Sequence, residues 1–86
     1  MSVPIEPSNA HYHPPVKRSV EIAGHKTSIS LEPVFWTMLK DAAERNGVPI
    51  NALVGRIDAE RIAAETPPGL ASAIRVWLVA ELANKT

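Results

Sequence analysis

The sequence predicts a mainly α-helical fold, in which one short β-strand is followed by three helices and two copies of the chain intertwine as a homodimer. An alternating run at residues 25–31 is typical of a strand, and three later segments carry apolar residues at helical spacing. The chain has 86 residues and no cysteine. Chains this short are commonly stabilised by disulfides, a metal or a partner chain, and we expect the partner chain.

The first 16 residues contain four prolines and no apolar periodicity. Such a segment buries too little apolar surface to offset the entropy lost on ordering, so we predict a flexible arm over residues 1–16 and a folded domain over residues 17–86. His11 and His13 flank Tyr12 in the arm. Without further ligands they are expected to be solvated, and we predict no metal site and no other cofactor.

The strand is predicted at about residues 25–31. Ile29 and Leu31 alternate there with polar residues, so apolar and polar side chains lie on opposite faces. The preceding run, residues 17–23, also alternates and stops at Gly24. This glycine either turns the chain into a hairpin or kinks one long strand.

Three helices are predicted to follow, at about residues 33–46, 49–65 and 70–84. A proline begins each of the first two, and Asn46-Gly47 ends the first. The run Thr66-Pro67-Pro68-Gly69 ends the second. The residues expected in the core or the dimer interface share the apolar faces of these segments: Ile29, Leu31, Phe35, Trp36, Leu39, Leu53, Ile57 and Trp77.

A lone strand leaves its backbone N–H and C=O groups without partners. Only the run at residues 25–31 reads strongly as a strand, so its expected partner is the same strand of a second copy. A two-fold axis would pair the two strands antiparallel. The predicted homodimer therefore has a two-stranded antiparallel ribbon at its centre.

The charge and hydropathy of the chain limit where it is expected to act and what it is expected to do. Nine basic and nine acidic residues cancel, but Lys17, Arg18 and Lys26 lie near a single carboxylate, Glu21, and local charge steers a partner more than the sum does. No run approaches the roughly 18–20 apolar residues that cross a membrane. The N-terminus lacks the pattern of a secretion signal, and no catalytic motif occurs. We expect a cytoplasmic protein that is neither an enzyme nor membrane-bound.

The stretch HKTSISLEPVFWTMLKDAAERNGVPINALVGRI, from His25 to Ile57, resembles the ribbon-helix-helix repressors of the Arc/MetJ type. More narrowly, the chain is similar to a bacterial family of stand-alone ribbon-helix-helix domain proteins, over roughly residues 18–82. The segments that carry this resemblance are Gly24-His25-Lys26-Thr27-Ser28, Ser30-Leu31-Glu32, Phe35-Trp36, Ile57-Asp58 and the run from Leu70 to Leu78.

The resemblance implies a DNA-binding transcription regulator, a repressor, that inserts a dimeric antiparallel ribbon into the major groove. Lys26, Ser28 and Ser30 would then contact the base edges. A lysine can donate to O6 and N7 of guanine, and a serine hydroxyl can donate or accept. The implied partners are double-stranded DNA and a second copy of the chain, and further copies could join on the DNA.

The resemblance also implies phosphate contacts at the start of the second helix, where free N–H groups bind a phosphate. Pro49 stands at that cap and offers neither a hydroxyl nor an N–H, so the contact passes to its neighbours. The expected phosphate contacts are Lys17, Arg18, His25, Ile50 and Asn51.

Two other functions stay open. An antitoxin-like module would bind DNA through the ribbon and a protein partner through the helix at residues 70–84. A protein-interaction or assembly module would use the same helix and bind little or no DNA. Trp77 and the apolar character of this helix favour the antitoxin-like module. The zero net charge and Pro49 at the cap of the second helix favour the assembly module.

Overall fold

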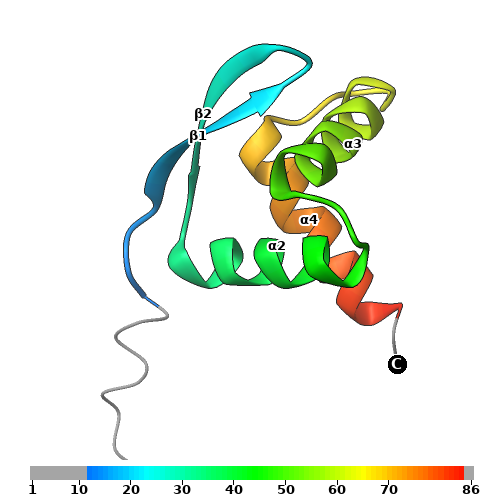
Figure 1. Ribbon diagram of the computed structural model, residues 1–86. Helices are drawn as coiled ribbons and strands as arrows, with labels where there is room; N and C mark the ends of the chain where they lie inside the picture. The colour runs from blue at the N-terminus through cyan, green and yellow to red at the C-terminus, as the bar shows by residue number, and fades with distance from the viewer. Residues whose placement is uncertain (1–11, 85–86) are drawn as a thin grey trace, which may run out of the picture.

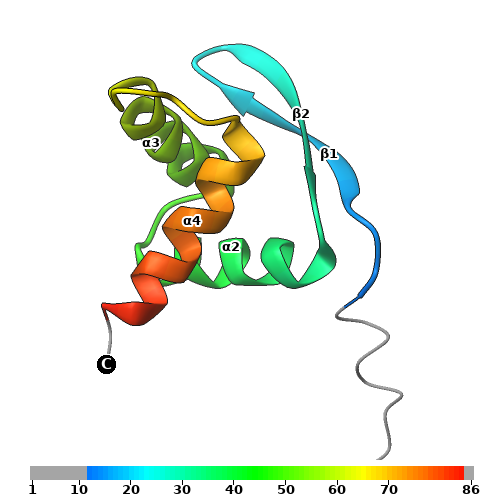
Figure 2. The ribbon, with the colours of Figure 1, turned by 180° about the vertical axis from the view of Figure 1, so that it is seen from behind.

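The computed structural model describes residues 12–84. Two strands form an antiparallel hairpin, and three helices follow (Figures 1 and 2). The elements are β1 (Val16–Ile22), β2 (His25–Leu31), α2 (Pro33–Arg45), α3 (Ile50–Ile62) and α4 (Leu70–Ala83). The predicted fold class, a ribbon followed by helices, is confirmed. His11 and the rest of residues 1–11 lie outside the described part of the chain.

The expectation that β2 finds no partner in its own chain is wrong. β1 pairs with β2 along its whole length, from Val16 opposite Leu31 to Ile22 opposite His25. The alternation at residues 17–23 was therefore a second strand, and β1 begins inside the segment predicted to be flexible. Because β2 already has a hydrogen-bonding partner, the ribbon needs no second copy to form. Intertwining of two copies stays a prediction.

The two strands are joined by a two-residue loop. Ala23 and Gly24 both have positive φ, 51° and 82°. Two residues with positive φ between paired strands are the pattern of a type I′ turn, whose twist matches that of a hairpin. Gly24 thus turns the chain and does not merely kink one long strand.

Local sequence marks both ends of α2, whereas α3 ends earlier than its stop signal predicted. Pro33 occupies the first turn of α2, and Gly47, with a φ of 67°, follows its C-terminal end. α3 ends at Ile62, three residues before the predicted boundary. Arg61 there donates to the Pro68 carbonyl at 3.1 Å, a bond that holds the connection to α4 against the end of α3.

One core joins the inner face of the hairpin to all three helices. Its largest fully buried side chains are Leu31, Leu39, Leu53, Val54, Ile57, Ile74 and Leu78. Fully burying such a side chain contributes about 1.5–3 kcal/mol. α4 supplies two of them, so it is part of the domain and not an appendage. Of the residues predicted for the core or dimer interface, Ile29 and Trp36 are also buried, and Phe35 and Trp77 are half-buried against the core.

Candidate nucleic-acid interface

One face of the hairpin points away from the helices. Strand alternation places six polar residues on it, and we call this set the ribbon outer face: Lys17, Ser19, Glu21, Lys26, Ser28 and Ser30. They pair across the strands, with Lys17 opposite Ser30, Ser19 opposite Ser28 and Glu21 opposite Lys26. Five of the six are exposed and Ser30 is half-buried. The predicted base-contact residues thus share a face with three residues of β1.

Sequence reasoning missed Ser19 and Glu21 as members of this surface and gave Lys17 only a phosphate role. The alternation at residues 17–23 was the signal that could have found them. Glu21 changes the chemistry of the face because it lies opposite Lys26, where cross-strand Cβ atoms are about 4.5–5.5 Å apart. This carboxylate partly offsets the lysine charge, and it adds an acceptor to a face of donors.

The inner face of β1 is held on α2 through Trp36. Its Nε1–H donates to the Val16 carbonyl oxygen at 2.9 Å. The guanidinium of Arg18 lies over the same indole, 5.2 Å from the ring centroid, within range of a cation–π interaction. Arg18 is therefore positioned by stacking, although its side chain stays exposed.

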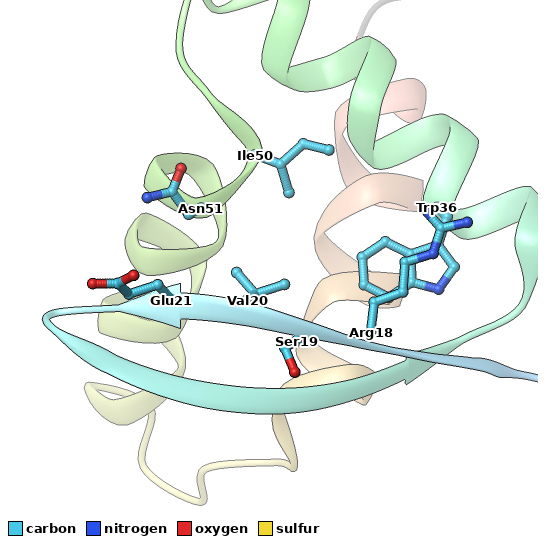
Figure 3. Close-up of a pocket in the computed structure, with 7 residues that line it drawn as sticks. All are labelled: Arg18, Ser19, Val20, Glu21, Trp36, Ile50 and Asn51. Atoms are coloured by element: carbon cyan, nitrogen blue, oxygen red, sulfur yellow. The ribbon is translucent and has the colours of Figure 1, made fainter.

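Arg18 shares a hollow of about 390 Å³ with the start of α3, where Ile50 and Asn51 lie. Ser19 and Glu21 reach the edge of the same hollow, so it holds one carboxylate as well as the guanidinium. Figure 3 shows Arg18 beside the Trp36 rings, while the Ser19 hydroxyl points to the other side of the strand. Arg18, Ile50 and Asn51 are thus three of the five predicted phosphate contacts, and the fold brings them together.

The start of α3 has backbone donors that no helical carbonyl satisfies. Pro49 precedes the helix in extended conformation, and no side chain caps it. The first backbone N–H groups that bond within the helix are those of Ala52 and Leu53, both to the Pro49 carbonyl at 3.1 Å. The N–H groups of Ile50 and Asn51 have no backbone partner within residues 12–84. Such groups form the positive end of the helix dipole.

The other two predicted phosphate contacts lie elsewhere. Lys17 belongs to the ribbon outer face. His25 is exposed at the turn end of the hairpin, where it lines a separate hollow with Asp58 and Arg61 of α3. Asp58 and Arg61 are joined there by an ion pair of 2.7 Å. His25 therefore stands beside the middle and end of α3, away from the residues at its start.

In the described residues no group of three histidine, cysteine or carboxylate side chains could hold a metal ion. Over the same residues, 12–84, each helix is too short or too polar to cross a membrane.

A family model described as a ribbon-helix-helix domain matches residues 15–82 of the chain. The match runs from the residue before β1 to the last turn of α4, so it includes the hairpin and all three helices. A comparison with curated proteins and another with solved structures each found no match.

Proposed function

This chain belongs to the ribbon-helix-helix domain family, whose members are in general DNA-binding transcription regulators, and we propose that it is a sequence-specific repressor that reads DNA with its hairpin. The observation that carries the proposal is the ribbon outer face, a polar surface that no other described element covers. We place its action in the bacterial cytoplasm, where it would occlude a promoter, its own among the candidates.

The dimensions of the hairpin support insertion into the major groove. Paired strands lie about 4.8 Å apart, and the groove, roughly 12 Å wide, admits a two-stranded ribbon. Three outward residues on one strand span about 13 Å, which is close to the length of four base pairs at about 3.4 Å each. One hairpin would therefore read a site of about four base pairs.

The composition of the face supports base recognition. Lys17 and Lys26 can donate to guanine, Glu21 can accept from the amino group of cytosine, and the serine hydroxyls can do either. The hairpin strands carry three cations and one carboxylate, within a chain whose net charge is zero. This local excess of positive charge favours approach to phosphates.

In this proposal the ribbon is the hairpin of one chain. A ribbon of two β2 strands, as the sequence suggested, would either displace β1 or become four strands wide. Four strands measure about 14 Å between the outermost backbones, which exceeds the groove width of roughly 12 Å. The intramolecular pairing of β1 with β2 therefore supports a dimer that carries two hairpins, and not one that shares a single ribbon.

Phosphate binding is assigned to the hollow at the start of α3. We propose that the Arg18 guanidinium and the N–H groups of Ile50 and Asn51 hold one phosphate, since a helix start and an arginine both favour an anion. Lys17 and His25 would contact phosphates only outside this hollow, at the outer face and at the hairpin turn.

The test is fluorescence anisotropy with DNA fragments from around the protein's own gene and with shuffled fragments. We expect tighter, salt-sensitive binding to a native fragment, and loss of that preference when Lys26, Ser28 and Ser30 are replaced together by alanine. The matched control replaces Thr37 and Lys40, which are exposed on α2. Equal binding of native and shuffled fragments, or an unchanged preference in the triple variant, would contradict the proposal.

A protein-interaction module is the second candidate function, either alone or as the antitoxin-like form that also binds DNA. The observation that favours it is the apolar exposed side of α4, where Val76, Val79 and Leu82 face solvent. The stand-alone form predicts no binding to any DNA fragment, while association through α4 persists. The anisotropy experiment therefore separates the stand-alone form from the repressor.

A further inference from the structure

We infer that Glu21 and Lys26 together recognise one C·G base pair at the turn end of the hairpin, with the carboxylate on cytosine and the ammonium on guanine. This rests on the proposed function, in which the ribbon outer face enters the major groove. Glu21 lies directly opposite Lys26 in the antiparallel register, next to the pair that closes the turn. Both side chains are exposed.

Both charged groups keep their binding capacity for a ligand. Within residues 12–84 neither side chain forms an ion pair or a hydrogen bond. Glu21 reaches the edge of the hollow that holds Arg18, but in Figure 3 its carboxylate lies at the turn end of β1 and points away from the guanidinium. A DNA base can therefore supply the partner that the carboxylate lacks in the described residues.

A carboxylate on a surface that enters DNA needs such a partner. Duplex DNA carries one negative charge per about 1.7 Å of its axis, so an unpaired Glu21 would weaken binding to every sequence. In the major groove the base groups that donate hydrogen bonds are the N4 amino group of cytosine and the N6 amino group of adenine. Guanine and thymine present acceptor oxygens there, which repel a carboxylate. Glu21 therefore restricts its base to cytosine or adenine.

Lys26 selects between these two bases. Side chains directly opposite in an antiparallel pair have Cβ atoms about 4.5–5.5 Å apart, so Glu21 and Lys26 can reach the two bases of one pair. The partner of cytosine is guanine, whose O6 and N7 both accept from a lysine. The partner of adenine is thymine, which offers one acceptor and a methyl group. An acidic and a basic side chain placed side by side thus match C·G better than A·T.

The other cross-strand pairs of the ribbon outer face lack this complementarity. Lys17 lies opposite Ser30, and Ser19 lies opposite Ser28. A serine hydroxyl can donate or accept, so these pairs tolerate more bases than a carboxylate does. Lys17 is also about 13 Å from Glu21 along β1. The strictest base requirement therefore lies at the turn end, and it distinguishes the two orientations of the hairpin on its site.

The experiment first selects a preferred duplex from random-sequence DNA with the wild-type protein. Fluorescence anisotropy then measures the affinity for all four base pairs at each position of that duplex. We expect one position at which C·G is bound about tenfold or more tightly than any other pair. Glu21→Gln should shift this preference toward adenine, because glutamine donates to N7 and accepts from N6. It should also bind shuffled DNA more tightly than the wild type, because a negative charge has been removed.

Two further variants make the test specific for joint recognition. Lys26→Ala should weaken the discrimination at the same position that responds to Glu21→Gln. Glu44→Gln, which removes the same charge from the exposed side of α2, should leave the preference at every position unchanged. All three substitutions are at exposed residues, so their circular dichroism spectra should match that of the wild type.

A Glu21→Gln protein that gains affinity on all sequences and keeps every base preference would overturn the inference, since Glu21 would then only repel phosphates. Responses to Glu21→Gln and Lys26→Ala at two different positions would exclude joint recognition. A wild type that prefers one sequence but has no such C·G position would refute the inference and leave the repressor proposal standing. A wild type without any sequence preference would contradict both.

Discussion

Arg75 of α4 places two guanidinium nitrogens on one carboxylate oxygen of Glu32, with Nε at 3.0 Å and Nη2 at 2.9 Å from Oε1. Glu32 is the single residue between β2 and α2, so this ion pair ties the last helix to the base of the ribbon. The same guanidinium lies 5.6 Å from the ring centroid of Phe35. α4 thereby helps to fix the position of the hairpin relative to α2, although α4 and the hairpin are far apart in sequence.

This ion pair predicts a pH dependence of stability. A hydrogen bond from its own backbone N–H and one from Arg75 lower the pKa of Glu32 from its ordinary value of 4.5, against a smaller opposing effect of burial. A group with a lowered pKa in the folded state stabilises the fold above its unfolded-state pKa, and this contribution is lost as the pH falls through the folded-state pKa. The ionised carboxylate should therefore stabilise the protein near neutral pH.

Replacing Glu32 by glutamine should lower the free energy of unfolding near neutral pH, and the difference from the wild type should shrink as the pH falls below 4.5. Urea unfolding at a series of pH values measures it. Glu44→Gln, on the exposed side of α2, is the control and should show little difference at any pH. A Glu32→Gln deficit that stays constant down to acid pH would contradict the assignment.

Two substitutions in the hairpin turn should change the stability of the protein in opposite directions. Ala23 holds a φ of 51°, a left-handed conformation that alanine disfavours and that asparagine tolerates better. Ala23→Asn should therefore stabilise the protein by up to about 1 kcal/mol. Gly24→Ala should destabilise it by about 1–2 kcal/mol, although no atom lies within 4 Å of the added Cβ, because the cost is in the backbone alone.

Thermal unfolding measures both turn variants. For a domain of this size, 1 kcal/mol shifts Tm by about 4–8 °C. Opposite shifts are expected, upward for Ala23→Asn and downward for Gly24→Ala. Two shifts of the same sign would mean that positive φ at these residues does not control the stability of the hairpin.

Local signals in the sequence predicted part of this architecture well. Pro33 marks the start of α2, and the alternation around Ile29 marks β2, because both depend on neighbours along the chain. The pairing of β1 with β2 was harder, since Ala23-Gly24 lacks the asparagine or aspartate that usually announces a two-residue turn. A weak turn signal left the hairpin undecided, and the missing partner was then sought in another molecule.

The candidate site could likewise be predicted only in part from local sequence signals. Lys17 and Arg18 are neighbours in sequence and were both expected at phosphates, but strand alternation sends them to opposite faces of the ribbon. The place of Arg18 over Trp36 depends on the register of β1 over α2, which no local pattern encodes. The grouping of Arg18 with Asn51 likewise requires the tertiary fold, because the two are far apart along the chain.

The hydrogen bond from the Trp36 indole should contribute to the attachment of β1 to α2. Trp36→Phe keeps an aromatic ring but removes the Nε1–H donor to the Val16 carbonyl. A carbonyl that loses its partner in a part-buried place costs about 1–3 kcal/mol, and we expect a loss of stability of that size in urea unfolding. Trp77→Phe is the matched control, since Trp77 is only half-buried, and it should lose less. A larger loss at Trp77 would contradict the role given to Trp36.

Lys26 and Arg18 should affect DNA binding in different ways, because one is assigned to bases and the other to a phosphate. Lys26→Ala removes a donor from the ribbon outer face, so it should cost about 1–3 kcal/mol on the preferred sequence and little on shuffled DNA. Arg18→Gln should weaken binding on every sequence alike, and it should reduce the slope of log K against log salt by about 1. Titrations at several salt concentrations, with Lys40→Ala as a control on the exposed side of α2, separate the two effects. If Lys26→Ala lowered the salt slope and left the sequence preference intact, Lys26 would be a phosphate contact, and the reading surface would have to lie on the remaining residues of the ribbon outer face.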